Sequence, residues 1–208
     1  MNHRMRTTSK ASIASVATAL VALAVALLVP LTSSSSVAAA TTASGGYRLV
    51  GADGSVYPFG NAASLGSLRG TPLARPIVGS ATTPSGNGYW LVASDGGIFS
   101  FGDARFFGST GNIRLNQPVV GIGRTSIGNG YYTVAADGGV FSFGDAKFFG
   151  STGNIRLNKP VVGILPSPTD LGYTFAASDG GIFNYGDARF FGSTGNITLN
   201  RPVVGIIR

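Results

Sequence analysis

The stretch GYWLVASDGGIFSFGDARFFGSTGNIRLNQPVVGI, residues 88–122, decides the fold of this chain because it recurs almost letter for letter. Two further copies occupy residues 130–164 and 172–206, and a more divergent copy begins at Gly46. Corresponding residues in consecutive copies are 42 positions apart. A fixed period of this length is typical of repeat architectures, in which each unit packs on its neighbours.

The composition of the repeated region favours short strands joined by tight turns. The 208 residues include 32 Gly, 13 Phe and 7 Tyr, no Cys, and only 11% charged residues. Aromatic residues suit strands and glycine suits turns, so we expect an all-β fold with little helix. The absence of cysteine excludes disulfides and thiolate chemistry.

The first forty residues have the features of a secretory signal peptide. Basic residues precede an apolar run at 11–29, and small residues at 37–40 provide a cleavage point. We therefore expect residues 1–40 to be a signal peptide, residues 41–45 a lead-in linker and residues 46–208 the repeat domain. The apolar run approaches the length that spans a bilayer, so an uncleaved membrane anchor is the alternative.

The charge of the chain does not indicate nucleic acid as a partner. Beyond residue 40 there are 12 Lys and Arg against 8 Asp, so the net charge without the leader is near +4, compared with +7 for the full sequence. Such a mildly basic balance is too weak to predict nucleic-acid binding.

An Asp-Gly pair between two apolar runs marks a hairpin in every copy. Aspartate tolerates turn conformations and bonds its own backbone, so we interpret these residues as structural rather than chemical. The turn residues are Asp53, Gly54, Asp95, Gly96, Asp137, Gly138, Asp179 and Gly180.

The predicted turn also sets the register of the hairpin. A two-residue type I′ turn, which needs a positive φ at both Asp95 and Gly96, would pair Trp90 with Phe101 and Val92 with residue 99. Both faces of this hairpin are largely apolar, so we expect both to be covered.

Two further strands are predicted in each copy. In the second copy they occupy residues 105–108 and 118–122, with proline acceptable as the first residue of the latter. Each copy is then a four-stranded antiparallel unit, which is typical of a β-propeller blade.

The two ends of the repeat region are complementary if each blade begins at the Pro-Val-Val-Gly strand. The region starts at the second strand of a blade, at Tyr47, and finishes after a first strand, residues 202–207. Pairing of that strand with the first copy would close a ring of four blades within a monomer and remove exposed sheet edges. A larger ring made by two chains and an open stack are the alternatives.

The first copy departs from the other three. It has Asn61 where they have aspartate, Arg48 at the position of Trp90, and Pro58 within the second strand of the hairpin. These changes are typical of a terminal repeat with looser packing demands.

The sequence WLVASDGGIFSFGDA, followed by FFGS and PVVGI, resembles a repeat of secreted actinobacterial proteins. That repeat is often appended to cell-wall or ester hydrolases and is thought to form β-propellers. The resemblance covers residues 46–208 and implies a propeller-like fold in an exported protein. It implies no particular ligand, because the repeat family has no agreed one.

Catalysis is not supported by the residue types present. Beyond the leader the chain has no His, Cys or Glu, so a Ser-His-Asp triad, a thiol nucleophile and a His-ligated zinc are excluded. We expect no cofactor and no metal site. A glycosidase-like hydrolase that uses two aspartates is the enzymatic alternative, although the aspartates recur with the repeat and only Asp170 stands outside it.

A cation followed by two phenylalanines recurs in three copies, while the first copy has Ala63-Ser64-Leu65. Neighbours on a strand face opposite ways, so one Phe can pack between blades while the other is presented to a ligand. The alternative is that both are core. The candidate ligand-binding residues are Arg105, Phe106, Lys147, Phe148, Arg189 and Phe190.

Together these features predict an exported, non-catalytic binding or scaffold module of the cell envelope. The expected partners are a cell-wall polymer, a glycan or another envelope protein, with membrane contact only through an uncleaved leader. A purely structural surface protein is the remaining alternative.

Overall fold

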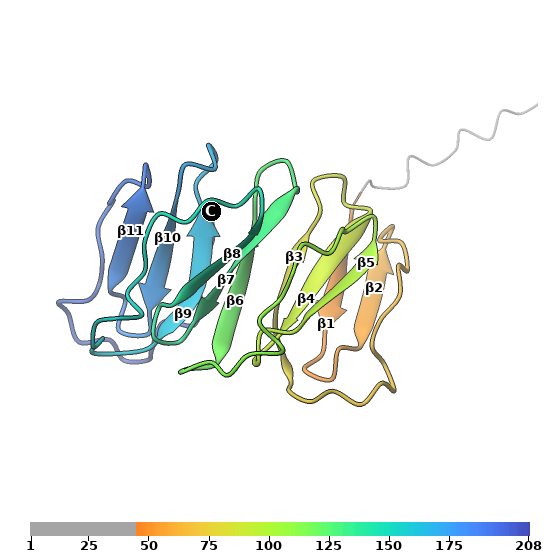
Figure 1. Ribbon diagram of the computed structural model, residues 1–208, viewed down its shortest axis with the longest axis horizontal. Helices are drawn as coiled ribbons and strands as arrows, with labels where there is room; N and C mark the ends of the chain where they lie inside the picture. The colour runs from red at the N-terminus through yellow and green to blue at the C-terminus, as the bar shows by residue number, and fades with distance from the viewer. Residues whose placement is uncertain (1–44) are drawn as a thin grey trace, which may run out of the picture. The chain divides into compact units, whose positions relative to one another are not determined.

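The computed structural model describes residues 45–208. These residues form eleven strands in four antiparallel sheets, without a helix among them (Figure 1), which confirms the predicted all-β fold. The strands are β1 (Gly46–Val50), β2 (Val56–Gly60), β3 (Ile77–Thr82), β4 (Gly88–Ala93), β5 (Ile98–Gly102), β6 (Val119–Arg124), β7 (Gly130–Ala135), β8 (Val140–Gly144), β9 (Val161–Pro166), β10 (Gly172–Ala177) and β11 (Ile182–Gly186).

The predicted signal peptide, residues 1–40, and residues 41–44 of the predicted linker lie outside the described residues. From residue 45 onward, the structure contains no helix of the length and hydrophobicity needed to cross a bilayer.

Each three-stranded sheet combines the last strand of one copy with the hairpin of the next. The sheets β3-β4-β5, β6-β7-β8 and β9-β10-β11 have three strands, in which the Pro-Val-Val-Gly strand pairs with the first strand of the following hairpin. The hairpin of the first copy forms the two-stranded sheet β1-β2, and the last strand of that copy, β3, pairs with β4. Figure 1 shows the four sheets side by side in chain order, with β1-β2 and β9-β10-β11 at the two ends of the row.

The predicted strand at residues 105–108 is absent, and this segment is irregular backbone. Gly102 and Gly108 at its ends have φ angles of 64° and 132°, which turn the chain away from strand geometry. The backbone here bonds side chains instead of a ladder: the Phe107 N–H, for example, donates to the Tyr131 hydroxyl at 3.1 Å. The sheets therefore have three strands, not the four predicted.

The hairpin turn is also of a different type from the one predicted. The Ala93 N–H donates to the Gly97 carbonyl at 2.9 Å, and the Gly96 N–H donates to the Ala93 carbonyl at 2.8 Å. This is a three-residue loop with a type I turn and a glycine bulge. Gly96 has a φ of 84°, whereas Asp95 is not in the left-handed region; among residues 45–208 only one non-glycine residue, Asp170, is.

The extra loop residue shifts the hairpin register by one. Trp90 is paired with Ser100 and Val92 with Ile98, so the predicted pairing of Trp90 with Phe101 is wrong. A shift of one residue changes which side chains share a face, because side chains alternate along a strand.

The hydrophobic core lies between neighbouring sheets. Strands β4 and β7 are buried along their whole length, as expected for sheets that are covered on both faces. Trp90 and Val92 of β4 pack with Val119 and Tyr131 of the following sheet. Each sheet thus completes the core of the one before it, as repeat architecture requires.

Glycines allow the inner strands β3, β6 and β9 to lie close together. A Cβ added to Gly121 would lie 3.4 Å from the Cα of Gly163, and one added to Gly79 would lie 3.6 Å from the Cα of Gly121. The neighbouring residues Val78, Val120, Val162 and Val204 line an open groove of about 590 Å³ along these strands.

The predicted closure of the ring is not present. Residues 203–208 form no strand, and Val204 and Ile207 are 87% and 92% exposed. In β1, Tyr47 and Leu49 are 64% and 54% exposed, and β1 pairs only with β2. Both the first and the last sheet therefore present open surfaces.

Candidate functional site

The segment that follows the third strand of each sheet carries the cation and the two phenylalanines. In the second copy it is anchored by the buried Ala104 and by the Arg105 carbonyl, which accepts a hydrogen bond from the Trp90 Nε1 at 2.7 Å. In the third copy the anchor is the Tyr132 hydroxyl, which accepts from the Lys147 N–H at 3.1 Å. Burial raises the pKa of Tyr132 to about 12, so its hydroxyl stays protonated at pH values where an exposed tyrosine ionises.

The two phenylalanines of this segment face different surroundings. Phe107 and Phe149 are partly buried, and their rings meet Tyr131 and Tyr173 of the next sheet edge-on, with centroids 5.7 Å and 5.8 Å apart. The preceding phenylalanines point away from the core, at 60%, 60% and 62% exposed: Phe106, Phe148 and Phe190. Three copies thus present the same exposed aromatic ring.

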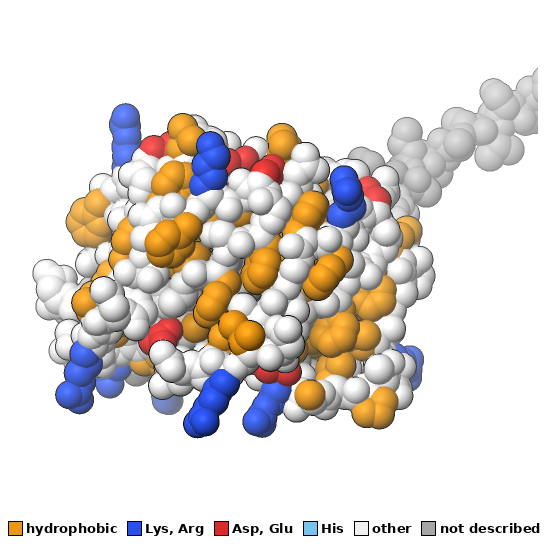
Figure 2. All heavy atoms as spheres, viewed as in Figure 1, with side chains coloured by type: hydrophobic (Ala, Val, Ile, Leu, Met, Phe, Trp, Pro, Cys, Tyr) orange, Lys and Arg blue, Asp and Glu red, His pale blue; other side chains and the backbone are white. Residues whose placement is uncertain are grey.

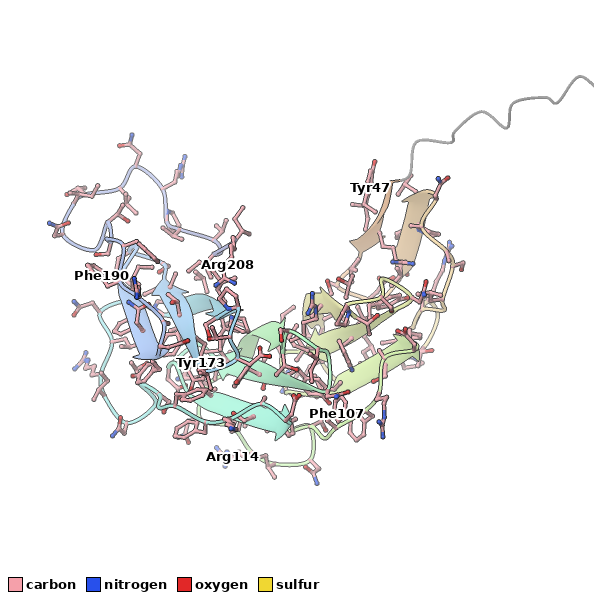
Figure 3. All side chains as sticks on the ribbon, turned by 90° about the horizontal axis from the view of Figure 1, so that it is seen from above. Tyr47, Phe107, Arg114, Tyr173, Phe190 and Arg208 are labelled. Carbon is pink, nitrogen blue, oxygen red and sulfur yellow. The ribbon has the colours of Figure 1, made fainter. Side chains whose placement is uncertain are left out.

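An exposed cation precedes each of these rings, namely Arg105, Lys147 and Arg189. The Arg105 guanidinium lies 5.9 Å from the centroid of the Phe107 ring, within range of a cation–π contact. Figure 3 shows Phe107 and Phe190 in their respective copies, with Tyr47 in the first copy.

The first copy does not present this surface. Ala63 and Ser64 stand in place of the cation and the exposed ring, and Leu65 packs inward against the core. The Arg48 side chain anchors the segment by donating from Nε to the Ala63 carbonyl at 3.1 Å. Arginine at the tryptophan position therefore preserves the backbone path but not the candidate surface.

The turn aspartates stabilise their own loops. Asp95, Asp137 and Asp179 each accept, through Oδ1, a hydrogen bond of 2.9–3.0 Å from the N–H two residues later. Asp53 accepts one from the Ser55 N–H at 2.9 Å, which lowers the pKa of Asp53. The glycines that follow have φ angles of 75° to 84°: Gly54, Gly96, Gly138 and Gly180.

A second set of aspartates ties loops to the ends of the sheets. Asp103 accepts from the hydroxyls of Ser85 at 2.5 Å and Thr83 at 2.8 Å, and these bonds lower its pKa. Asp187 is bonded by the Thr169 hydroxyl, which lowers its pKa in the same way. No cluster of three or more potential metal-ligating side chains occurs in the described part of the chain.

A basic edge that sequence reasoning missed lies at the hairpin turns. Arg75 and Arg114, from consecutive copies, line a shallow depression of about 430 Å³ together with Asp95 and Gln117. Figure 2 shows Lys and Arg side chains projecting along two opposite edges, with hydrophobic side chains over the face between them. The recurrence of Asn-Ile-Arg-Leu-Asn at residues 112–116 and 154–158 was the available signal.

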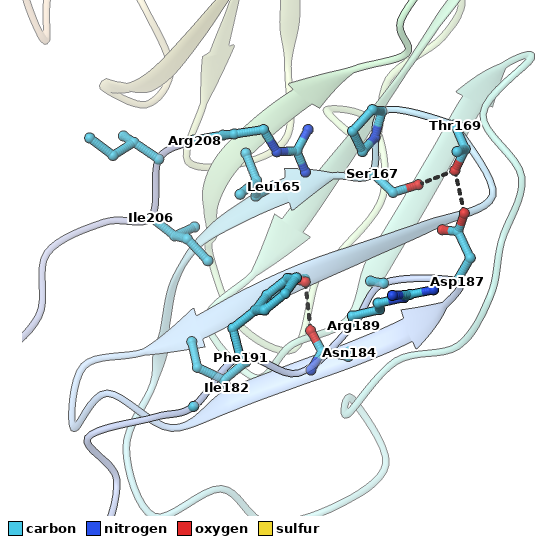
Figure 4. A pocket seen from close by; sticks show the side chains of 15 residues that line it. Leu165, Ser167, Thr169, Ile182, Asn184, Asp187, Arg189, Phe191, Ile206 and Arg208 are labelled. Carbon is cyan, nitrogen blue, oxygen red and sulfur yellow. Dashed lines mark hydrogen bonds between the residues drawn. The ribbon is translucent and has the colours of Figure 1, made fainter.

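A concavity of about 670 Å³ lies on the last sheet (Figure 4). It is lined by Leu165, Ile182 and Phe191 and crossed by a hydrogen bond of 2.6 Å from the Thr174 hydroxyl to the Asn184 side chain. The candidate residue Arg189 also lines it.

No protein-family model matches this chain, and no curated protein is significantly similar to it.

Proposed function

We propose that residues 46–208 form a non-catalytic binding module of the cell envelope that engages a repetitive, anionic or sugar-containing polymer. The observation that carries this proposal is the repeated exposed ring of Phe106, Phe148 and Phe190, at 60–62% exposure. In each of the three copies the exposed ring directly follows an exposed cation, and this repeated pairing of an aromatic ring with a charge supports an interaction surface.

The chemistry of each unit suits a sugar or an anionic group. An aromatic face packs on the apolar face of a sugar ring, while the adjacent Arg or Lys attracts phosphate or carboxylate. Three weak sites on one rigid body gain avidity on a polymer, on the order of 100-fold over a single contact.

The proposal includes a propeller-like arrangement of the sheets and export of the protein from the cell. The three-stranded sheets, their 42-residue spacing and the resemblance to repeats of secreted actinobacterial proteins support it. Aspartates such as Asp95 and Asp103 accept hydrogen bonds that hold turns and loops in place. This structural use of the carboxylates favours a binding module over an aspartate-dependent hydrolase.

The proposal is tested by retention on insoluble cell-wall polymer. The triple variant F106S/F148S/F190S should lose most of its co-sedimentation, roughly tenfold or more, because each site loses its aromatic platform. The matched control is I113S/I155S/I197S, which removes three equally repeated apolar side chains that are 54–58% exposed. This control should bind like the wild type.

A second variant examines the cations. Changing Arg105, Lys147 and Arg189 to Ser should remove the salt-sensitive part of binding, because exposed charges are screened by added salt. If both triple variants are retained as well as the wild type, the exposed segments are not sites and the module is a structural surface protein.

A further inference from the structure

Every internal junction between sheets is built from the same contacts. A tyrosine of one sheet donates its hydroxyl hydrogen to a glycine carbonyl of the preceding copy: Tyr89 to Gly66, Tyr131 to Gly108 at 2.7 Å and Tyr173 to Gly150 at 2.5 Å. An aromatic ring of the same sheet covers that glycine, since a Cβ on Gly108 would lie 2.7 Å from the Phe143 ring.

The two end sheets carry the separate halves of one more such junction. Counting 42 residues from the internal tyrosine and ring gives Tyr47 and Phe59, which stack at 5.4 Å and are 64% and 44% exposed. Counting from the internal Phe and glycine gives Phe191, which is 93% exposed, and Gly192, which has no neighbour within 4 Å of an added Cβ. The 670 Å³ concavity of Figure 4 lies on this last surface.

Residues 203–208 form no strand, but they lie in the position that an inner strand takes in the other copies. Their sequence VVGIIR differs at one position from that of β6, VVGIGR. The Val203 N–H donates to the Ser178 carbonyl at 2.8 Å, as the Val119 N–H of β6 donates to the Ser94 carbonyl at 2.9 Å. Ile206 packs over Gly163, at 3.5 Å from an added Cβ.

An inner strand pairs with the first strand of the hairpin that follows it. Residues 203–208 have no such hairpin after them in the described structure, and β1, the first strand of the first hairpin, has no inner strand beside it. In the internal sheets, Ile122 pairs with Thr133 and Ile164 with Phe175. The same offset places Ile206 opposite Leu49 of β1, whose inner edge has no strand partner among residues 45–208.

We propose that a second copy of this chain completes both junctions, with residues 203–208 of each copy pairing with β1 of the other. Tyr47 then donates to the Gly192 carbonyl of the other copy, and Phe59 covers Gly192. Head-to-tail contacts of this kind leave no open sheet edge when two copies close on each other around a two-fold axis. This inference does not depend on the proposed polymer binding.

Cysteine cross-linking tests the pairing directly, because the natural chain has no cysteine. Opposed residues of antiparallel strands lie within the distance that a disulfide spans. A mixture of full-length L49C and full-length I206C should therefore form a disulfide-linked pair on oxidation, whereas either variant alone should not. Replacing I206C by I127C, at an Ile that is 65% exposed elsewhere, gives the matched control and should abolish the product.

Two results would overturn the proposal. One is a mixture that yields no more product than the I127C control. The other is the double variant L49C/I206C oxidising within single chains, which would show that one chain closes on itself.

The mass in solution provides an independent measurement. Light scattering on the wild-type chain should give the mass of two copies, and a single-chain mass at all concentrations contradicts the proposal. F191S should weaken association at least tenfold, because it removes the ring that packs under Tyr47, while the neighbouring F190S should not. Polymer retention should show the opposite pattern, so failure of one proposal is distinguishable from failure of the other.

Discussion

At the scale of single residues, equivalent positions of the repeats hold side chains that differ in polarity, and a polar side chain in the core costs free energy of folding. Position 133 holds threonine where the neighbouring copies have Leu91 and Phe175. Thr133 is fully buried, and its hydroxyl has no hydrogen-bond partner in the described structure. A buried hydroxyl without a partner costs free energy, on the order of 1–3 kcal/mol.

We expect Thr133→Val to raise the free energy of unfolding by about 1 kcal/mol, because it replaces the unpartnered hydroxyl with a methyl group of similar size. The matched control is Thr125→Val. Thr125 is equally buried, but its hydroxyl bonds the Asp145 side chain at 2.9 Å and the Gly130 carbonyl at 3.2 Å. That variant should destabilise by about 1–3 kcal/mol. Denaturant midpoints that shift in the same direction for both variants would contradict this account.

At the scale of elements, the sequence predicted which segments are strands better than how they join. The apolar runs on both sides of Asp95-Gly96 and the Val-Val-Gly strand were predictable from periodicity and turn residues. The register was not, because Ser-Asp-Gly-Gly is compatible with a two-residue loop and with a three-residue loop that ends at Gly96. The hydrogen bond from the Gly97 N–H to Asp95 accompanies the longer loop.

The segment at residues 105–108 shows a different limit of sequence reasoning. Its composition suits a strand, but the Tyr131 hydroxyl of the next copy bonds the Phe107 N–H and the Gly108 carbonyl. Such a contact between copies cannot be read from one copy alone. The exposed ring of Phe106 was predictable as one of two alternatives from the alternation of neighbouring side chains, whereas the depression between Arg75 and Arg114 depends on how consecutive copies pack.

Loop anchoring by aspartate predicts a loss of stability in acid. The pKa values of Asp103 and Asp187 are lowered from 3.8, chiefly by hydroxyl hydrogen bonds. A lowered pKa in the folded state means that the stabilisation is present above pH 3.8 and is lost as the pH falls through the lower, folded-state pKa. The melting temperature should thus fall on acidification below about pH 4, and D103N/D187N should show a smaller fall. An unchanged slope in this variant would place the acid sensitivity elsewhere.

At the scale of the whole molecule, tyrosine hydroxyls connect consecutive sheets, so the junctions share one chemical weakness. Tyr131 and Tyr173 donate to glycine carbonyls, and burial raises the pKa of both above 10.0. Ionisation would remove the donated hydrogen and place a negative oxygen against the carbonyl oxygen. Because each sheet completes the core of its neighbour, loss of one junction exposes the next.

We therefore expect the repeat domain to lose stability cooperatively at alkaline pH. A pKa raised in the folded state means that this stabilisation is complete below pH 10 and is lost as the pH rises through the higher, folded-state values. The variant Y131F/Y173F loses two hydrogen bonds, about 1 kcal/mol each, and should be less stable at neutral pH. It cannot ionise at these positions, so its melting temperature should fall less between pH 9 and about pH 12. Parallel pH profiles for the variant and the wild type would show that the junction tyrosines do not control alkaline unfolding.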